Sequence, residues 1–490
     1  MYENNLKVWK QKIQEKRKTT SWNDFIMEIA SWYPLSMYKN NWLISVFPET
    51  WREGKIIPSN KYQQNYSNLL VDTDLFHWSF LKDFKNYFQV SYKSGNIDFG
   101  NNENSDYAYC AFWVKNSYLS FVVWDDCENI MYSSVVYTNC KNVYDSVLVH
   151  NNSHNIYGSK WIWESYNIFY SLNIYNSSNI INSSNLIGCH DCIECNDLEN
   201  KSYCYKNKEY TREDFFKIKS DYKNTQAKLE YRAKNISSIK VVWEWIFNSS
   251  DIELGFFVNR LNSWKNIAYI WGWNGSSNFY DTFEAWIDSN NFYAVCNAWT
   301  NTYDVYCSSL IDNGSSNIFY SYYMWACSYC LGCIWLQNKS YCIFNKQYSK
   351  EEWYYKVDEI FSKMDLDWEL GSFFLPEMNP FYYNDTAAWL MTNLTKEEVV
   401  SKWYMWRDEE IKVDIPEGST VVSTNDLDKY QWYDEQWNWK INPEILKVVI
   451  QDEKWNYYKI VEMEYDFLMK HELPIPEIHW MDRMKLNFGI

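Results

Sequence analysis

The chain has 490 residues, a formal net charge of −17 at pH 7 and a sequence pI near 4.9. Because an acidic chain is not attracted to phosphate backbones or anionic lipid, neither nucleic acid nor a membrane is an expected partner. No run approaches the roughly 18 apolar residues of a membrane span, and no apolar core follows the basic start MYENNLKVWKQK, so we expect no signal peptide.

Residues 1–100 mix helix-like and irregular segments, and we treat them as an N-terminal mixed region. From there to residue 210 the chain repeats a short unit, [S/C]-x-N-I-x-x-S-x-x-I, as in CENIMYS, SHNIYGS and SSNIINS. The central polar residues follow one another at steps of 12 or 13: Asn104, Asn116, Asn129, Asn142, Asn155, Asn167, Asn179 and Asp191.

A unit this short cannot bury its apolar residues alone, but it can when copies stack. Small Ser or Cys then fills a narrow interior, and identical Asn residues pass amide hydrogen bonds along the stack. We therefore predict a mainly β fold with two parallel β-solenoid (β-helix) halves, helical end caps and α+β terminal regions. A coil made of one repeat carries two short strands; a larger coil, made of two repeats, is the alternative.

The expected order is a first solenoid half at 101–210, a helical cap or connector at 211–235, and a second solenoid half at 236–348. A second cap follows at 349–365, and a C-terminal α+β region at 366–490. The second half repeats the polar ladder at Asp251, Asn266, Asn278, Asn291, Asp304 and Asn317. Both halves end on L-x-N-K-S-Y-C-x-x-N-K-x-Y, followed by the helix starts TRED at Thr211 and SKEE at Ser349.

The C-terminal region shows three further signals. A boxed helix start lies at Thr395, apolar runs on either side of Trp455 indicate a hairpin, and YDFLMKHEL predicts a short helix before Pro474.

Four cysteines end each half at the same spacing: Cys189, Cys192, Cys195 and Cys204, then Cys327, Cys330, Cys333 and Cys342. Four thiols at this spacing can form a tetrahedral Zn(II) site, which makes zinc the candidate cofactor. The repeat favours a different interpretation, because Cys189, Cys192 and Cys195 align with inward-facing Ser177, Ile180 and Ser183, where Cys is a small apolar filler. We prefer packing; only Cys204 and Cys342 lie off the repeat.

Tryptophan and glycine are present in abnormal numbers. The chain holds 29 Trp and only 13 Gly, less than half the usual glycine content of about 7%. Trp455 and Trp437 precede Asn in hairpin contexts, and Trp335 takes the place of the turn former Asp197 in the second half. Such positions favour glycine. We hypothesise that many of these Trp codons are UGA, read as glycine in the source organism; a protein truly rich in indoles is the alternative.

Several segments resemble one family: CxxCxxC with NKQYSKEE, the N-I-Y coils, NPFYYNDT, LTKEEVVSKWYMWRDEE and YYKIVEMEYDFLMKHELPIPEIH. The chain is similar to an uncharacterised cysteine-rich repeat family, associated with zinc ribbons, from candidate-phylum bacteria, some of which read UGA as glycine. The resemblance covers most of the chain from about residue 70. It implies a cytoplasmic protein with a terminal zinc-ribbon-like module, degenerate here because its cysteines are missing. It implies no activity.

No phosphate loop, nucleophile elbow or HExxH motif indicates catalysis. Of the six histidines, His190 beside Asp191 and the thiols is the best candidate for a role. Carboxylate pairs such as Asp125 and Asp126 suit glycoside hydrolysis, but they recur with no fixed place in the repeat. We expect a non-catalytic binding or scaffolding protein with a protein or carbohydrate partner. The alternative is a carbohydrate-active enzyme, a hydrolase or lyase, on a parallel β-helix.

Overall fold

The computed structural model describes residues 2–40, 43–48, 56–57, 79–91, 93–222, 282–285, 290–298, 302–390, 392, 394–408, 415 and 418–488. The chain divides into two compact units, each assembled from segments far apart in sequence. Unit 1 joins residues 1–95 to 239–407, and unit 2 joins 96–238 to 408–490. The described residues of each unit include a β-solenoid.

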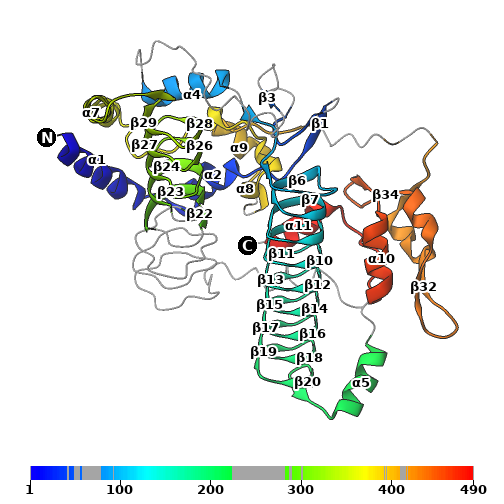
Figure 1. Cartoon of the computed structure of the whole chain (residues 1–490). Coiled ribbons are helices and arrows are strands. Elements are labelled where there is room, and N and C mark those ends of the chain that lie inside the picture. Colours follow the sequence, from blue (N-terminus) through cyan, green and yellow to red (C-terminus); the bar gives the residue numbers. More distant parts are fainter. Residues whose placement is uncertain are drawn as a thin grey trace. The chain divides into compact units, whose positions relative to one another are not determined.

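The solenoid of unit 2 is one long stack of strands, in which all but the last pair in parallel (Figure 1). Its strands are β5 (Asp98–Phe99), β6 (Tyr107–Phe112), β7 (Lys115–Trp124), β8 (Glu128–Met131), β9 (Ser134–Tyr137), β10 (Lys141–Tyr144), β11 (Val147–His150), β12 (His154–Tyr157), β13 (Lys160–Trp163), β14 (Tyr166–Phe169), β15 (Leu172–Tyr175), β16 (Ser178–Ile181), β17 (Ser184–Ile187), β18 (His190–Ile193), β19 (Asn196–Glu199), β20 (Ser202–Tyr205) and β21 (Lys208–Glu209).

Each coil of the stack contains one repeat and two strands. β8 pairs in parallel with β10, with Glu128 opposite Lys141, and β9 pairs with β11, with Ser134 opposite Val147. The next coils continue this register, as in Ile156 opposite Ile168. The shorter coil predicted from the repeat is therefore confirmed, and the coil made of two repeats is excluded.

Every third residue of a coil turns the chain by adopting the left-handed conformation. In the coil from Asn129, that residue, Tyr132, Val135 and Thr138 have φ between +50° and +62°. Most L-residues adopt this region only at a cost of about 1–2 kcal/mol, and Asn and Asp tolerate it best. This preference explains why Asn marks the repeat. The residue after a turn, such as Ile130, points into the interior and is buried.

Four columns of side chains fill the interior of this solenoid. The isoleucine column contains Ile130, Val143, Ile156, Ile168, Ile180, Cys192 and Cys204, and the valine column contains Val136, Val149, Ile162, Ile174, Leu186 and Leu198. The serine column contains Ser133, Ser146, Ser159, Ser171, Ser183 and Cys195, and the mixed column contains Cys127, Cys140, Ser153, Ser165, Ser177 and Cys189.

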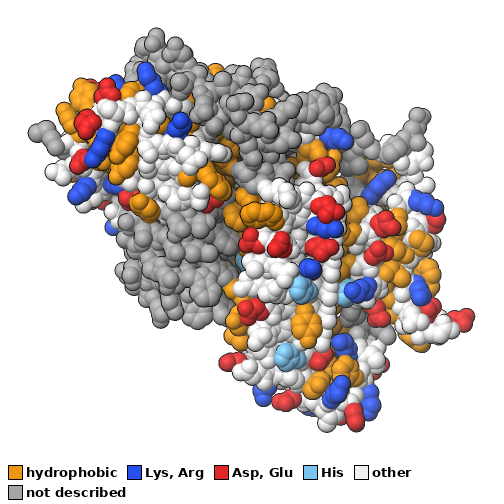
Figure 2. All heavy atoms as spheres, viewed as in Figure 1, with side chains coloured by type: hydrophobic (Ala, Val, Ile, Leu, Met, Phe, Trp, Pro, Cys, Tyr) orange, Lys and Arg blue, Asp and Glu red, His pale blue; other side chains and the backbone are white. Residues whose placement is uncertain are grey.

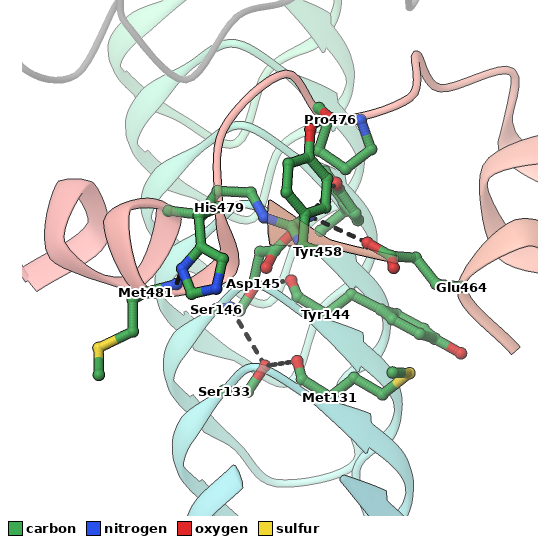
Figure 3. A network of polar contacts seen from close by, with 12 residues as sticks. Met131, Ser133, Tyr144, Asp145, Ser146, Tyr458, Glu464, Pro476, His479 and Met481 are labelled. Atoms are coloured by element: carbon green, nitrogen blue, oxygen red, sulfur yellow. Dashed lines mark hydrogen bonds and ion pairs between the residues drawn. The ribbon is translucent and has the colours of Figure 1, made fainter. Parts of the chain in front are cut away.

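The serine column supplies polar groups that the turns require. Ser146 N donates to Ser133 Oγ at 3.1 Å (Figure 3), and Ser159 N donates to Ser146 Oγ at 3.0 Å. Each hydroxyl in turn donates to a carbonyl two residues earlier, as Ser133 does to Met131 at 2.7 Å. Because a buried amide without an acceptor costs about 1–3 kcal/mol, the narrow interior needs small hydroxyls at this position.

Unit 1 contains a second solenoid of the same design. Its described strands are β22 (Thr282–Ala285), β23 (Asn290–Ala298), β24 (Tyr303–Asp312), β25 (Ser316–Phe319), β26 (Tyr322–Trp325), β27 (Ser328–Leu331), β28 (Ile334–Gln337), β29 (Ser340–Ile343) and β30 (Lys346–Gln347). Asp304, at φ +55°, and Asn317, at φ +54°, continue the predicted ladder. Its first members, Asp251 to Asn278, lie outside the described residues.

The remaining described elements of unit 1 are mostly helical: α1 (Tyr2–Arg17), α2 (Trp22–Glu28), η1 (Ala30–Trp32), β1 (Tyr38–Asn40), β2 (Leu43–Ser45), β3 (Ile56–Ile57), α4 (Phe80–Val90), β4 (Lys93–Ser94), α7 (Lys350–Leu366), η5 (Pro376–Met378), η6 (Tyr383–Asp385), α8 (Ala387–Leu390) and α9 (Lys396–Ser401). None of the helices described in either unit is both long and apolar enough to cross a membrane.

Both solenoids end in the same cap. After an antiparallel turn back at β21 or β30, a helix begins at Thr211, as α5 (Arg212–Asp221), or at Ser349, as α7. Trp353 of α7 donates its indole N–H to the carbonyl of Cys342 at 3.2 Å. The capping boxes at Ser349 and Thr395 are confirmed, and Thr211 caps α5 through the amide of Asp214.

The C-terminal part of unit 2 is the predicted α+β region. It consists of β31 (Val421–Ser423), η7 (Thr424–Lys429), β32 (Gln431–Tyr433), β33 (Trp439–Ile441), η8 (Pro443–Lys447), β34 (Val449–Gln451), β35 (Tyr457–Tyr458), α10 (Glu462–His471) and α11 (Trp480–Phe488). The hairpin predicted around Trp455 is confirmed by the antiparallel pair β34–β35, and the helix predicted in YDFLMKHEL is α10.

Outside the solenoids, four tryptophans occupy left-handed turns and point into solvent. Trp437 (φ +62°) and Trp455 (φ +67°) each end a hairpin loop D-E-x-W-N, while Trp368 (φ +62°) and Trp403 (φ +69°) follow the ends of α7 and α9. Their exposed fractions are 70%, 68%, 87% and 73%. Glycine is the usual residue both at a bulged hairpin turn and just after a helix. Trp335 has φ +55°, close to the +56° of Asp197.

Candidate functional site

The four cysteines that end the solenoid of unit 2 all lie in interior columns. Cys192 is the register neighbour of Ile180 and of Cys204, and Cys195 ends the serine column. Cys195 Sγ accepts the amide of Asn207 at 3.4 Å, as a serine oxygen does higher in the stack. A hydrogen bond between the two thiols, together with burial, raises the pKa of Cys192, and the same bond lowers the pKa of Cys195.

The second set repeats this arrangement in unit 1. Cys330 pairs in register with Cys342, and Cys333 Sγ accepts the amide of Asn345 at 3.4 Å. Burial raises the pKa of Cys330, and hydrogen bonds with the thiols of Cys327, Cys333 and Cys342 raise it further. Cys330 therefore interacts with the three other thiols of its set, of which Cys342 lies in the next coil.

One detail of the sequence interpretation was wrong. Cys204 and Cys342 do not lie off the repeat, because each occupies the isoleucine column directly below Cys192 or Cys330. All eight thiols thus fill interior positions, and all are at most 1% exposed. Among the described residues, no group of three or more His, Cys, Asp or Glu side chains has an arrangement that could hold a metal ion. The zinc site stays a prediction.

The predicted asparagine ladder is continuous along unit 2. Each amide donates to the next oxygen at 2.9–3.1 Å, in the order Asn104, Asn116, Asn129, Asn142, Asn155, Asn167, Asn179 and Asp191. The last acceptor is the carboxylate of Asp191, which lies 3.9 Å from Lys219 of α5. A shorter ladder from Asn173 through Asn185 likewise ends on a carboxylate, Asp197. A chain of aligned donors thus ends on the strongest available acceptor.

The face beside this ladder is polar and open to solvent. Its column begins with residues of alternating charge, Glu103, Lys115, Glu128 and Lys141. Lys115 forms an ion pair with Glu103 at 3.3 Å, and Lys141 forms one with Glu128 at 3.4 Å. Figure 2 shows red and blue side chains alternating along the solenoid of unit 2, with pale blue histidines beyond them. Exposed ion pairs are worth about 0–1 kcal/mol each, so this face contributes more to solubility than to stability.

The opposite side of the ladder carries an aromatic column that is covered by helices. In unit 2 this column is Tyr144, Tyr157 and Phe169, and Phe467 of α10 lies against all three, with ring centroids 4.4, 6.1 and 6.4 Å away. These rings are at most 5% exposed, whereas Tyr166 on the open face is 50% exposed.

A buried charge cluster fixes the same helices to the solenoid. Arg483 of α11 places Nη1 2.6 Å from Asp145 Oδ2, 3.0 Å from Glu464 Oε1 and 3.3 Å from the hydroxyl of Tyr157. Its guanidinium also lies over the ring of Tyr132, 5.0 Å from the centroid. Figure 3 shows Glu464 of α10 beside Asp145, with Tyr458 and His479 close by. The three charged side chains are at most 1% exposed.

Burial dominates the electrostatics of this cluster. It raises the pKa of Asp145 to about 7, although Arg483 acts in the opposite direction. It also raises the pKa of Glu464 against the same guanidinium. Two carboxylates therefore share one cation in a dry environment, and a proton on the pair relieves the excess negative charge.

The other candidates from the sequence lie apart from this cluster. The imidazole of His190 is exposed, and its Nδ1 lies 2.7 Å from Ser178 Oγ. Asp125 and Asp126 lie on an exposed corner, where partial burial and then Asp126 raise the pKa of Asp125. Sequence reasoning missed the Asp145–Glu464–Arg483 cluster. Asp145 occupies a turn position of the repeat like any other, and its partner lies 338 residues away.

Comparison with known proteins adds no relative. No family model, no curated protein and no solved structure matches this chain.

Proposed function

We propose that this chain is a non-catalytic binding or scaffolding protein whose solenoids hold helical protein segments, its own and those of a protein partner, against their aromatic columns. The supporting observation is that both solenoids use the same column in the same way. In unit 2, Phe467 packs on Tyr144 and Tyr157. In unit 1, the equivalent ring of Phe319 packs against Phe361 of α7, 5.3 Å away.

Cations accompany the aromatic contacts in both units. Lys10 of α1 donates to Asp304 at 2.9 Å and to Asn317 at 2.6 Å, and its ammonium lies 5.6 Å from the centroid of the Tyr306 ring. Arg483 has the matching role over Tyr132 in unit 2. In both units the aromatic anchor and the cation lie on different helices, so a pair of helices, one with an aromatic anchor and the other with a cation, is the partner chemistry that the column fits.

A peptide probe tests this function. A labelled peptide of residues 460–488 is titrated into the full-length protein, and fluorescence anisotropy reports binding. We expect saturable binding that weakens at least tenfold when the peptide carries Phe467→Ala and Arg483→Ala, because both anchors are lost. Tyr144→Ala in the protein should weaken binding in the same way. A peptide that fails to bind at millimolar concentration would contradict the proposal.

A carbohydrate-active enzyme is the second candidate. Asp125 and Asp126 share a corner with Trp113, which is 53% exposed, and Asp126 N donates to the carbonyl of Trp113 at 3.0 Å. Carboxylates beside an exposed indole suit sugar binding. Release of reducing or unsaturated ends from a polysaccharide panel, abolished by Asp125→Asn with Asp126→Asn, would favour the enzyme over the scaffold.

Structural zinc is an addition to the scaffold and needs its own test. The thiols lie in the interior columns at the end of each solenoid, where they already donate to carbonyls, as Cys330 does to Ser328 at 3.5 Å, and accept amides, as Cys333 does. Elemental analysis of the purified full chain decides between metal and packing: less than about 0.5 Zn per chain leaves packing as the account of the thiols.

A further inference from the structure

The attachment of α10 and α11 to the solenoid of unit 2 depends on a buried cluster with unequal charges. Asp145 and Glu464 carry two carboxylates, and Arg483 carries one positive charge. Glu464 Oε2 has no hydrogen-bond partner among the described residues, although it is fully buried. With both acids ionised, the cluster has a net charge of −1 in an environment that water does not reach.

The surrounding titratable groups do not neutralise this charge. The nearest are tyrosines, and burial raises the pKa of each, so they stay uncharged in the neutral range: Tyr132, Tyr144, Tyr157 and Tyr458. Asp452 and Asp466 add negative potential, since Asp452 raises the pKa of Tyr458 and Asp466 that of Tyr144. His479 packs near Tyr458, with ring centroids 6.2 Å apart, and His471 packs on Phe467 at 4.4 Å.

We propose that Asp145, Glu464 and Arg483 form a proton-dependent latch, which holds α10 and α11 over the aromatic column and releases them when the shared proton is lost. The proton binds to a carboxylate oxygen of the pair and leaves as solvent hydronium or to hydroxide, so no covalent bond of the protein backbone changes. Because the covered column is the surface to which we assign partner binding, the latch rests on the proposed function and adds its regulation.

The direction of the effect follows from linkage. An acid whose pKa is higher in the closed state binds more protons there, so closure is favoured at low pH and weakens as pH rises from about 4 towards 7. One proton changes the opening equilibrium by at most tenfold per pH unit. His471 acts oppositely, since burial lowers its pKa to about 4 from about 6.5, and its protonation therefore opposes closure as pH falls from about 6.5 towards 4. The two effects nearly cancel below about pH 6.5, so the latch stays closed up to that pH and opens towards pH 8.

Hydrogen exchange of the full-length protein tests the latch without any partner. Amide exchange is followed by mass spectrometry at several pH values between 5 and 8 and corrected for the intrinsic pH dependence. Peptides from 462–471 and 480–488 report opening, and peptides from 178–193 report the solenoid itself. We expect opening of the two helices to increase about threefold between pH 5 and 8, most of it above pH 6.5, with little change in the solenoid.

Two nearly isosteric variants and one control complete the design. Asp145→Asn and Glu464→Gln each leave one carboxylate for one guanidinium, so in both variants the opening should no longer increase with pH. Asn also suits the φ of +48° at position 145. Asp106→Asn removes an exposed carboxylate of the same solenoid and should behave as the wild type.

The latch is overturned if the wild-type helices open equally at pH 5 and 8, or if Asp145→Asn and Glu464→Gln both keep the wild-type slope. Either result leaves the scaffold proposal standing. Conversely, if helix opening responds to pH as expected but the peptide binds at no pH, the scaffold proposal is refuted and the latch proposal stands.

Discussion

Replacement of four exposed tryptophans by glycine should stabilise this protein. The variant combines Trp368→Gly, Trp403→Gly, Trp437→Gly and Trp455→Gly, whose native φ values lie between +62° and +69°. A non-glycine residue in this region costs about 1–2 kcal/mol. Glycine returns about 0.5–1 kcal/mol of that through its larger unfolded-state entropy. Because the indoles are 68–87% exposed, their removal sacrifices little buried surface.

The net gain is about 0.5–1 kcal/mol per site, and each unit holds two of the four sites. The sites lie in separate turns, so the gains should add. For units of this size, about 1 kcal/mol shifts the melting temperature by about 2–4 °C, which predicts a rise of roughly 2–8 °C. Differential scanning calorimetry of the wild type and the variant measures it.

Trp353→Gly is the matched control. Its side chain is fully buried in the cap of unit 1 and lies in the interior of α7, so this change should destabilise unit 1 by at least about 3 kcal/mol. If the four-site variant melts below the wild type, the conformational argument fails, and with it the structural support for glycine at these positions. The codons provide the independent test, since UGG at most Trp positions would end the recoding hypothesis.

Three further predictions concern unit 2. Cys195→Ser should change the free energy of unfolding by less than about 1 kcal/mol, because serine already fills that column. Cys192→Ser should cost about 1–3 kcal/mol, because it buries a hydroxyl in an apolar column. Denaturant unfolding distinguishes the two variants, and equal, large losses would indicate that both thiols bind a metal. Arg483→Met leaves two buried carboxylates without their cation and should cost about 3–5 kcal/mol, measured by thermal unfolding; a neutral result would mean that the cluster is already protonated or hydrated. Burial lowers the pKa of His150 to about 3 and that of His471 to about 4, below the value near 6.5 in the unfolded chain. The contribution of these neutral imidazoles to stability is therefore complete above about pH 6.5 and is lost as pH falls towards 4. A His150→Phe variant whose stability keeps the full sensitivity to acid would contradict this assignment.

The solenoid could be predicted because its information is local and repeated. Each coil needs four left-handed turns and four inward side chains, so the requirement for Asn at a turn and Ser in the serine column returns once in every coil. The ladder from Asn104 to Asp191, the length of the coil and the caps at Thr211 and Ser349 were all predictable for this reason. A repeated pattern also placed three of each set of four cysteines in the interior.

Only the tertiary structure decided which faces are covered and which side chains meet. The residues 408–490 pack with the first solenoid rather than with the second, which precedes them in the chain. Asp145 looks like another turn residue, and nothing near it in the sequence indicates that Arg483 neutralises it. A periodic sequence specifies a stack, because each coil packs against a neighbouring coil of similar sequence. The pairing of a single acid with a single base occurs once, over a separation of 338 residues, and depends on a fold that brings both into one dry interface.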